Sequence, residues 1–134
     1  MDNSKKILLV EDYKDIREML AALLIGKGFQ VSTAIDGSDG LKQAQANPPD
    51  LIVTDTNMPK LSGIDMTKQL RQMPEFATTP IIVLSSDRFV QRAALQAGAN
   101  EFLKKPMSFA TLLSIIERLL GLSLESAASL ALNK

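Results

Sequence analysis

Short apolar runs recur along the chain, and most of them end on polar or charged residues. The continuous runs are residues 7–10, 51–53, 81–84 and 102–103. Runs of this length are too short for helices, and unbroken hydrophobicity is typical of strands that are covered on both faces of a parallel sheet. A further segment, 29–33, alternates apolar and polar positions and indicates an edge strand. The pattern therefore predicts five strands.

Amphipathic segments lie between these strands and after the last one, with apolar residues recurring at three- and four-residue spacing. They predict helices over about 15–26, 41–46, 64–73, 89–97 and 112–120. In the fourth helix we expect Phe89 and Val90 to belong to the apolar face, and Gly98 to end the helix. Alternating strands and helices without an internal repeat predict a doubly wound α/β fold. We expect a five-stranded parallel sheet of order 2-1-3-4-5, the flavodoxin-like arrangement, with five helices.

Composition narrows the possible functions. The 134 residues suit one domain, and 15 basic and 15 acidic residues leave no overall charge to favour direct nucleic-acid binding. No cysteine is present, so disulfides and thiolate sites are excluded, which fits a cytoplasmic protein. Residues 1–6 precede only four apolar positions, which predicts neither a signal peptide nor a membrane span. Histidine is also absent, so a site must use carboxylates, hydroxyls, lysine and backbone groups.

Three carboxylates are predicted to meet at one edge of the sheet. Glu11 and Asp12 end the first strand, and Asp55 ends the third. These strands are neighbours in the predicted order, and the switch point between them is where ligands bind in such sheets. Carboxylates that share a pocket repel one another unless a cation lies among them, and oxygen ligands favour Mg²⁺.

A hydroxyl and an ammonium group are predicted to approach the same pocket. Ser85 ends the fourth strand and Lys105 follows the fifth. Both groups suit phosphate oxygens. A carboxylate nucleophile, a divalent cation and a lysine together favour in-line phosphoryl transfer onto Asp55, which would yield an acyl phosphate.

Several short motifs share the order and spacing of one family. They are Val10-Glu11-Asp12, Asp36-Gly37 (itself a turn), Asp55 with Met58-Pro59 and Gly63, Leu84-Ser85-Ser86, Ala97-Gly98-Ala99, and Phe102-Leu103-Lys104-Lys105-Pro106. With these motifs, residues 5 to about 120 resemble the receiver domain of two-component response regulators, and the chain is similar to stand-alone regulators of chemotaxis and phosphorelays.

The resemblance implies roles for the residues that match the motifs. Asp55 is expected to be the phosphoacceptor, with Mg²⁺ held by Asp55, Glu11, Asp12 and the backbone carbonyl of Asn57. Lys105 is expected to contact the phosphoryl group, and its bond to Pro106 is often cis in the family.

The resemblance also implies a conformational switch. Ser85 takes the position of the switch hydroxyl and Phe102 that of the switch aromatic. The polar residues Asn57 and Asp87 flank the site, and such a pair accompanies faster loss of the phosphoryl group, so we predict a short-lived phosphorylated state. Tyr13 departs from the family pattern, in which a second acid or amide is common at that position.

Expected partners follow from the same resemblance. A sensor histidine kinase or a histidine phosphotransfer protein would supply the phosphoryl group. The output would pass to a downstream protein, or to a second copy, through the face of the fourth helix, fifth strand and fifth helix. That face is polar and mildly basic and includes Arg88, Gln91, Arg92, Gln96, Asn100 and Lys104. No direct contact with nucleic acid or membrane is expected.

The sequence predicts one domain followed by a short tail. We expect a receiver domain over residues 1–121 and a tail over 122–134 that forms a marginal helix or is disordered. The chain would be no enzyme beyond phosphorylation and dephosphorylation of its own Asp55. One alternative is an interaction module that works without phosphorylation. Another is a phosphohydrolase of the haloacid-dehalogenase type, which is disfavoured because Asn57 stands where a second aspartate is needed. A fragment of a longer regulator is a further alternative.

Overall fold

A five-stranded parallel sheet forms the centre of the molecule. The computed structural model describes residues 4–122. The strands are β1 (Lys6–Val10), β2 (Gln30–Ala34), β3 (Leu51–Asp55), β4 (Ile81–Ser85) and β5 (Glu101–Lys104). Their order is β2-β1-β3-β4-β5, and every neighbouring pair is parallel. The fold and strand order predicted from the sequence are confirmed.

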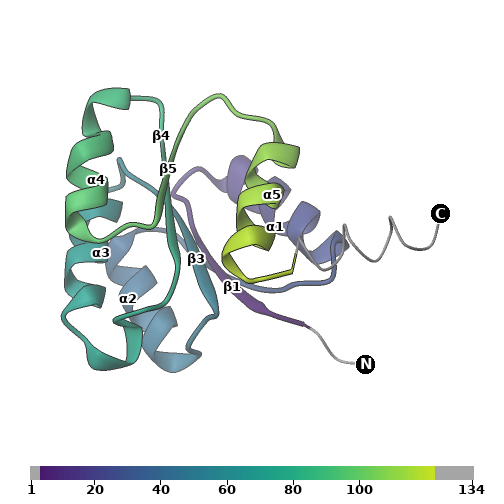
Figure 1. The fold of residues 1–134 in the computed structure, drawn as a ribbon, viewed down its shortest axis with the longest axis horizontal. Coiled ribbons are helices and arrows are strands. Elements are labelled where there is room, and N and C mark those ends of the chain that lie inside the picture. Colours follow the sequence, from purple (N-terminus) through teal and green to yellow (C-terminus); the bar gives the residue numbers. More distant parts are fainter. Residues whose placement is uncertain (1–3, 123–134) are drawn as a thin grey trace.

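Over residues 4–122, five α-helices cover the two faces of the sheet (Figure 1). They are α1 (Lys14–Gly26), α2 (Gly37–Ala46), α3 (Gly63–Arg71), α4 (Gln91–Ala97) and α5 (Phe109–Leu119). Two 3₁₀ turns, η1 (Pro74–Phe76) and η2 (Arg88–Val90), precede β4 and α4. Helices α1 and α5 lie on one face, and α2, α3 and α4 lie on the other.

The central strands divide their side chains between two cores. Leu8 and Val10 of β1 belong to the core beneath α2, α3 and α4, whereas Ile7 and Leu9 belong to the core beneath α1 and α5. Successive strand residues point to opposite faces, so burial on both faces requires the unbroken apolar runs seen in the sequence. The two cores fix the sheet between its helix layers and hold the carboxyl ends of the strands at one edge.

Short polar side chains start three of the helices at that edge or near it. Asp36 Oδ1 accepts a hydrogen bond from Asp39 N at 2.7 Å, and Ser62 Oγ accepts one from Asp65 N at 3.1 Å. Ser108 caps α5 in the same way through Thr111 N. Such caps satisfy amide groups that lack partners inside the helix. At the C-terminal end of α4, Gly98 adopts a left-handed conformation with φ of 115°, as expected for a residue that ends a helix.

The start of the fourth helix differs from the prediction. Phe89 and Val90 lie in η2 instead of α4, and 85% of Phe89 is exposed. The placement of Phe89 on an apolar helix face was therefore wrong. Asp87 Oδ1 accepts the amide hydrogen of Phe89 at 2.9 Å, and this local bond stabilises a tight turn that points the ring outward.

Apart from Leu122, the tail predicted for residues 122–134 lies outside the described residues. Leu122 itself packs against the core on the α1 and α5 side. Over residues 4–122, no helix is both long enough and apolar enough to cross a membrane.

Candidate functional site

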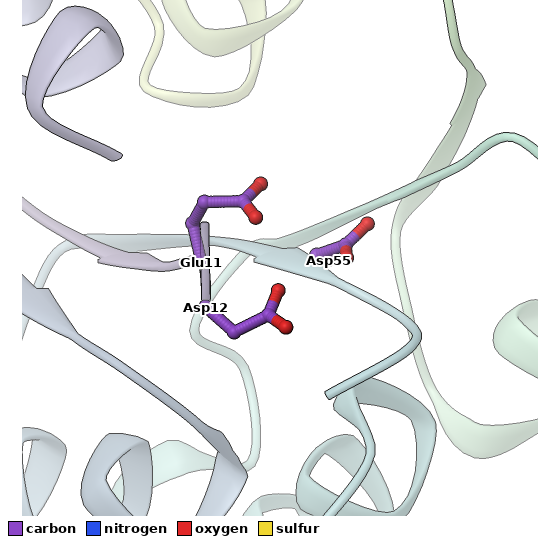
Figure 2. Close-up of side chains that lie close together, drawn as sticks. All are labelled: Glu11, Asp12 and Asp55. Carbon is purple, nitrogen blue, oxygen red and sulfur yellow. The ribbon is translucent and has the colours of Figure 1, made fainter. Parts of the chain in front are cut away.

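The carboxyl ends of β1 and β3 bring three carboxylates together. Val10 pairs with Thr54 in the sheet, so the next residues, Glu11 and Asp55, leave adjacent strands side by side. With Asp12, they offer oxygen atoms that all lie within 4.8 Å of one another. Figure 2 shows the three carboxylates extending into the same space. The convergence predicted from strand order is therefore present.

Lys105 reaches this cluster from the loop after β5. Its Nζ lies 3.0 Å from Asp55 Oδ1 and 3.5 Å from Glu11 Oε1. The backbone of Lys105 is fixed as well, because its amide donates to the carbonyl of Ser85 at 2.8 Å. The Lys105–Pro106 peptide bond is cis, as expected from the resemblance. One ammonium group thus bridges two of the three carboxylates.

The electrostatics of the cluster show in two pKa shifts. Burial raises the pKa of Glu11 above its ordinary 4.5, and the charge of Asp55 adds to this, although the Tyr13 amide and Lys105 oppose it. Burial alone would lower the pKa of Lys105. The hydrogen bond and charge of Asp55, together with the charge of Glu11, outweigh burial and hold that pKa above 10.5. The site therefore favours a charged lysine and penalises the negative charge of Glu11.

The donor set fits a hard divalent cation. Three carboxylates and one ammonium group leave an excess of two negative charges when all are ionised. Every candidate ligand atom is an oxygen, which is the ligand type that Mg²⁺ selects. The side chain of Glu11 is only 3% exposed and that of Asp55 13%, so water screens these charges poorly. A divalent cation would balance the charge of the cluster.

Glycine at position 63 allows the loop after β3 to fold tightly against Asp55. The Gly63 amide donates to the carbonyl of Thr56 at 3.1 Å, and Thr54 Oγ1 donates to the carbonyl of Asp55 at 2.9 Å. A Cβ at position 63 would lie 2.0 Å from the Asp55 carbonyl oxygen. No side chain fits this close approach. The sequence motif contained Gly63, but only the structure gives its physical reason.

Arg17 is a supporting residue that sequence reasoning missed. Its Nη1 donates to the carbonyls of Glu11 at 2.9 Å and Asp12 at 3.3 Å. The guanidinium thereby holds the backbone that carries both acids. Its spacing from the acidic pair on the first turn of α1 was the available signal, but an arginine on a helix surface is ordinary and did not stand out.

The remaining predicted site residues lie at the end of β4, in β5 and in the loops after β3 and β4. Ser85 is 1% exposed and ends β4 directly after Leu84, which pairs with Asp55. Its Oγ accepts a hydrogen bond from Asp87 N at 3.0 Å. Asn57 is exposed in the loop two residues after Asp55. Phe102 pairs with Val83 in the sheet and packs against the core on the α2, α3 and α4 side.

Comparison with known proteins assigns this arrangement to a family. The family model described as the response regulator receiver domain matches residues 7–117. The chain belongs to this family. Receiver domains are signalling modules of two-component systems rather than catalytic enzymes, and the site at the carboxyl ends of β1 and β3 lies within the matched range.

A curated receiver-containing relative is longer than this chain. The transcriptional regulatory protein PrrA of Mycobacterium tuberculosis is 40% identical over 119 residues, which cover 87% of this chain and 50% of PrrA. The chain thus spans about half the length of PrrA from each of three mycobacteria.

Solved receiver structures match the whole fold. The chemotaxis response regulator CheY4 of Vibrio cholerae is 33% identical, with a TM-score of 0.82, covering 87% of this chain and 99% of CheY4. The receiver domain of sensor histidine kinase PA1611 of Pseudomonas aeruginosa is 32% identical, with a TM-score of 0.81, covering 88% and 98%. The PA1611 structure has a magnesium ion coordinated in its active-site cleft.

Proposed function

We propose that this receiver domain accepts a phosphoryl group on Asp55 from a sensor histidine kinase or a histidine phosphotransfer protein. The observation that carries the proposal is the contact of 3.0 Å between Lys105 Nζ and Asp55 Oδ1 within a cluster of three carboxylates. An ammonium group fixed beside the carboxylate can contact the oxygens of an incoming phosphoryl group and stabilise part of the negative charge that they carry. Residues 1–121 form the proposed module, and the cytoplasmic location expected from the sequence is part of the proposal.

The chemistry is the transfer of one phosphoryl group from a histidine nitrogen of the donor to a carboxylate oxygen of Asp55. A carboxylate oxygen of Asp55 attacks phosphorus, the phosphorus–nitrogen bond of the donor phosphohistidine breaks, and its electron pair returns to the imidazole. An acyl phosphate forms on Asp55. Lys105 balances the charge on the transferred oxygens, while Arg17 and Gly63 fix the backbone around the reacting carboxylate.

Glu11, Asp12, Asp55 and the backbone carbonyl of Asn57 would hold Mg²⁺ in this site. The all-oxygen donor set and its excess negative charge support that assignment. Bound Mg²⁺ would supply the charge stabilisation that a phosphoryl group needs as it approaches three carboxylates. The negative residues therefore serve as ligands, and the lysine remains the fixed positive group of the chain itself.

Ser85 and Phe102 would convert phosphorylation into a change of shape. Ser85 ends β4 next to the strand of Asp55, so its hydroxyl can turn toward a phosphoryl oxygen on that residue. Phe102 pairs with Val83 two residues before Ser85, close enough to repack when β4 and its loop move. The α4-β5-α5 face would then change for a downstream protein or a second copy. Asn57 and Asp87, which lie two residues beyond Asp55 and Ser85 in the sequence, would shorten the life of the phosphorylated state.

Intact-mass measurement tests the proposed activity. The protein is incubated with acetyl phosphate and Mg²⁺, and the expected result is a mass gain of one phosphoryl group that requires Mg²⁺ and is absent in Asp55→Ala. Asp50→Ala provides a matched control, because Asp50 is an exposed acid at the opposite end of the same strand. A lack of any adduct with both acetyl phosphate and phosphoramidate would instead favour an interaction module that works without phosphorylation.

A further inference from the structure

An exposed aromatic ring is the feature that the proposed phosphoryl chemistry leaves unexplained. Phe89 is the most exposed large apolar side chain of residues 4–122, at 85%. It lies in η2, directly after the short loop that follows Ser85 at the end of β4. Keeping an aromatic ring in water forgoes the stabilisation that burial would give. Such a ring, held outward by a hydrogen-bonded turn, is suited to contact another molecule.

Phe89 lies in a surface hollow at the start of α4. The hollow has a volume of about 610 Å³ and is lined by Arg88, Phe89, Gln91, Arg92, Leu95 and Gln96. We call these six residues the α4 groove. Its apolar part is the ring of Phe89 and the side chain of Leu95, which is 43% exposed. The groove thus combines an apolar strip with four polar side chains.

The charge of the α4 groove has a single sign. Two of its residues are arginines and none is acidic. Among residues 4–122, neither Arg88 nor Arg92 forms a salt bridge, and the guanidinium of Arg88 lies 5.7 Å from the centre of the Phe89 ring. Arginine and aromatic side chains are the residues that dominate the energetics of protein interfaces. Two unpaired arginines beside an apolar strip complement a partner that carries carboxylates and an apolar side chain.

We propose that the α4 groove binds an acidic protein segment that places one aromatic or aliphatic side chain against Phe89 and Leu95 and its carboxylates against Arg88 and Arg92. Nucleic acid fits this surface less well, because two arginines provide few phosphate contacts and the whole chain has no net positive charge. The proposal names the chemistry of the downstream partner and, for its regulation alone, rests on phosphorylation of Asp55.

Two consecutive hydrogen bonds connect the groove to the phosphorylation site. Asp87 N donates to Ser85 Oγ at 3.0 Å, and Phe89 N donates to Asp87 Oδ1 at 2.9 Å. A phosphoryl group on Asp55 that attracts the Ser85 hydroxyl would therefore shift Asp87 and, with it, the turn that presents Phe89. Phosphorylation then changes the affinity for the acidic segment, and the segment changes the phosphorylation equilibrium by the same factor.

Selection from a random dodecapeptide library tests the surface without phosphorylation. Immobilised full-length protein is expected to select peptides enriched in Asp and Glu around a Phe, Leu or Trp. The dissociation constant of a selected peptide should rise at least tenfold in Phe89→Ala and in Arg92→Glu. Ile25→Ala and Lys27→Glu are matched controls on the exposed end of α1 and should leave it unchanged. Circular dichroism and acetyl-phosphate labelling of each variant show that it remains folded.

Three results would contradict the proposal that the α4 groove binds an acidic segment. They are a selection without acidic enrichment, selected peptides that bind Phe89→Ala and Arg92→Glu as well as the unaltered protein, and a Phe89-dependent self-association that identifies a second copy as the occupant.

The proposed effect of phosphorylation on peptide affinity is measured separately. In protein that intact mass shows to be phosphorylated, the dissociation constant of the selected peptide should differ at least fivefold from that of unphosphorylated protein. An unchanged constant in phosphorylated protein contradicts the hydrogen-bonded connection. Failure to form the adduct contradicts the proposed phosphorylation and leaves the result for the peptide surface standing.

Discussion

Individual charges at the carboxylate cluster oppose folding and favour ligand binding. Glu11 is buried beside Asp55 and Asp12, and only Lys105 balances them within the described residues. Close like charges in a poorly hydrated site destabilise a protein, and a bound cation removes that penalty. Neutralising a carboxylate of the cluster is therefore expected to stabilise the metal-free protein.

Replacement of Glu11 tests this conflict. A glutamate whose pKa is raised by folding contributes stability below its unfolded pKa, and this contribution is lost as the pH rises through the folded value. At pH 7.5 the neutral side chain of Glu11→Gln should therefore increase the unfolding free energy of the metal-free protein by about 1 kcal/mol. This corresponds to a rise in melting temperature of about 2–4 °C. The substitution should also remove most of the stabilisation by Mg²⁺. Glu18→Gln, an exposed change on α1, should do neither, and a lower melting temperature for Glu11→Gln would contradict the account.

Lys105 should make stability depend on alkaline pH. Its pKa is raised in the folded protein, so its contribution is complete below the unfolded value of 10.5 and is lost as the pH rises through the higher folded value. The difference in unfolding free energy between the unaltered protein and Lys105→Gln should be constant from pH 7 to 9 and should shrink above about pH 10.5. Urea titrations at each pH measure it. Lys104→Gln, at the exposed neighbouring position, is the matched control and should change the unfolding free energy only slightly.

At the scale of elements, close backbone approaches place the loops that surround the site. The start of α3 lies against the carbonyl of Asp55, and the C-terminal end of α3 is joined by Arg71 to the segment between α4 and β5. The Arg71 contacts join residues that are far apart in the sequence, and the Asp55 contact depends on the absence of a side chain at Gly63. They were therefore not predicted from the hydrophobic pattern, although the pattern correctly predicted the elements that they join.

Gly63→Ala should disrupt the loop after β3. Its Cβ would lie 2.0 Å from the Asp55 carbonyl oxygen, so the backbone must move. We expect a loss of more than about 2 kcal/mol of unfolding free energy and slower labelling by acetyl phosphate. Gly26→Ala is the matched control, since no atom lies within 4 Å of its Cβ position. Denaturant unfolding measures both variants, and equal stability of the two would contradict the role assigned to Gly63.

Arg71→Met should loosen the connection between α3 and α4. Arg71 donates to the carbonyls of Gly98 at 3.0 Å and Phe76 at 2.6 Å, and to Asn100 Oδ1 at 2.9 Å. Removal leaves the partly buried carbonyls of Gly98 and Phe76 without this donor, which we expect to lower the unfolding free energy by about 2–3 kcal/mol. Lys68→Met on the exposed side of α3 should change it by less than about 0.5 kcal/mol. A similar small effect for Arg71→Met would show that the three bonds contribute little.

At the scale of the whole molecule, the sheet order and the convergence of Glu11, Asp12 and Asp55 could be predicted from the sequence. Unbroken apolar runs define buried parallel strands, and parallel strands bring their carboxyl ends to one edge. The outward position of Phe89 could not be predicted from the sequence, because the spacing of apolar residues places Phe89 on the apolar face of a helix. A single side-chain bond from Asp87 to the Phe89 amide decided that position, and local bonds of this kind leave no hydrophobic signal.

The acceptor role of Asp55 is the central claim, and borohydride trapping tests it most directly. Protein labelled with acetyl phosphate and Mg²⁺ is reduced with borohydride, which converts an aspartyl phosphate to homoserine, and is then digested and sequenced by mass spectrometry. If Asp55 is the acceptor, homoserine is expected at position 55 and aspartate at positions 12, 36 and 50. Homoserine at another position, or a labelled protein without homoserine at position 55, would contradict it.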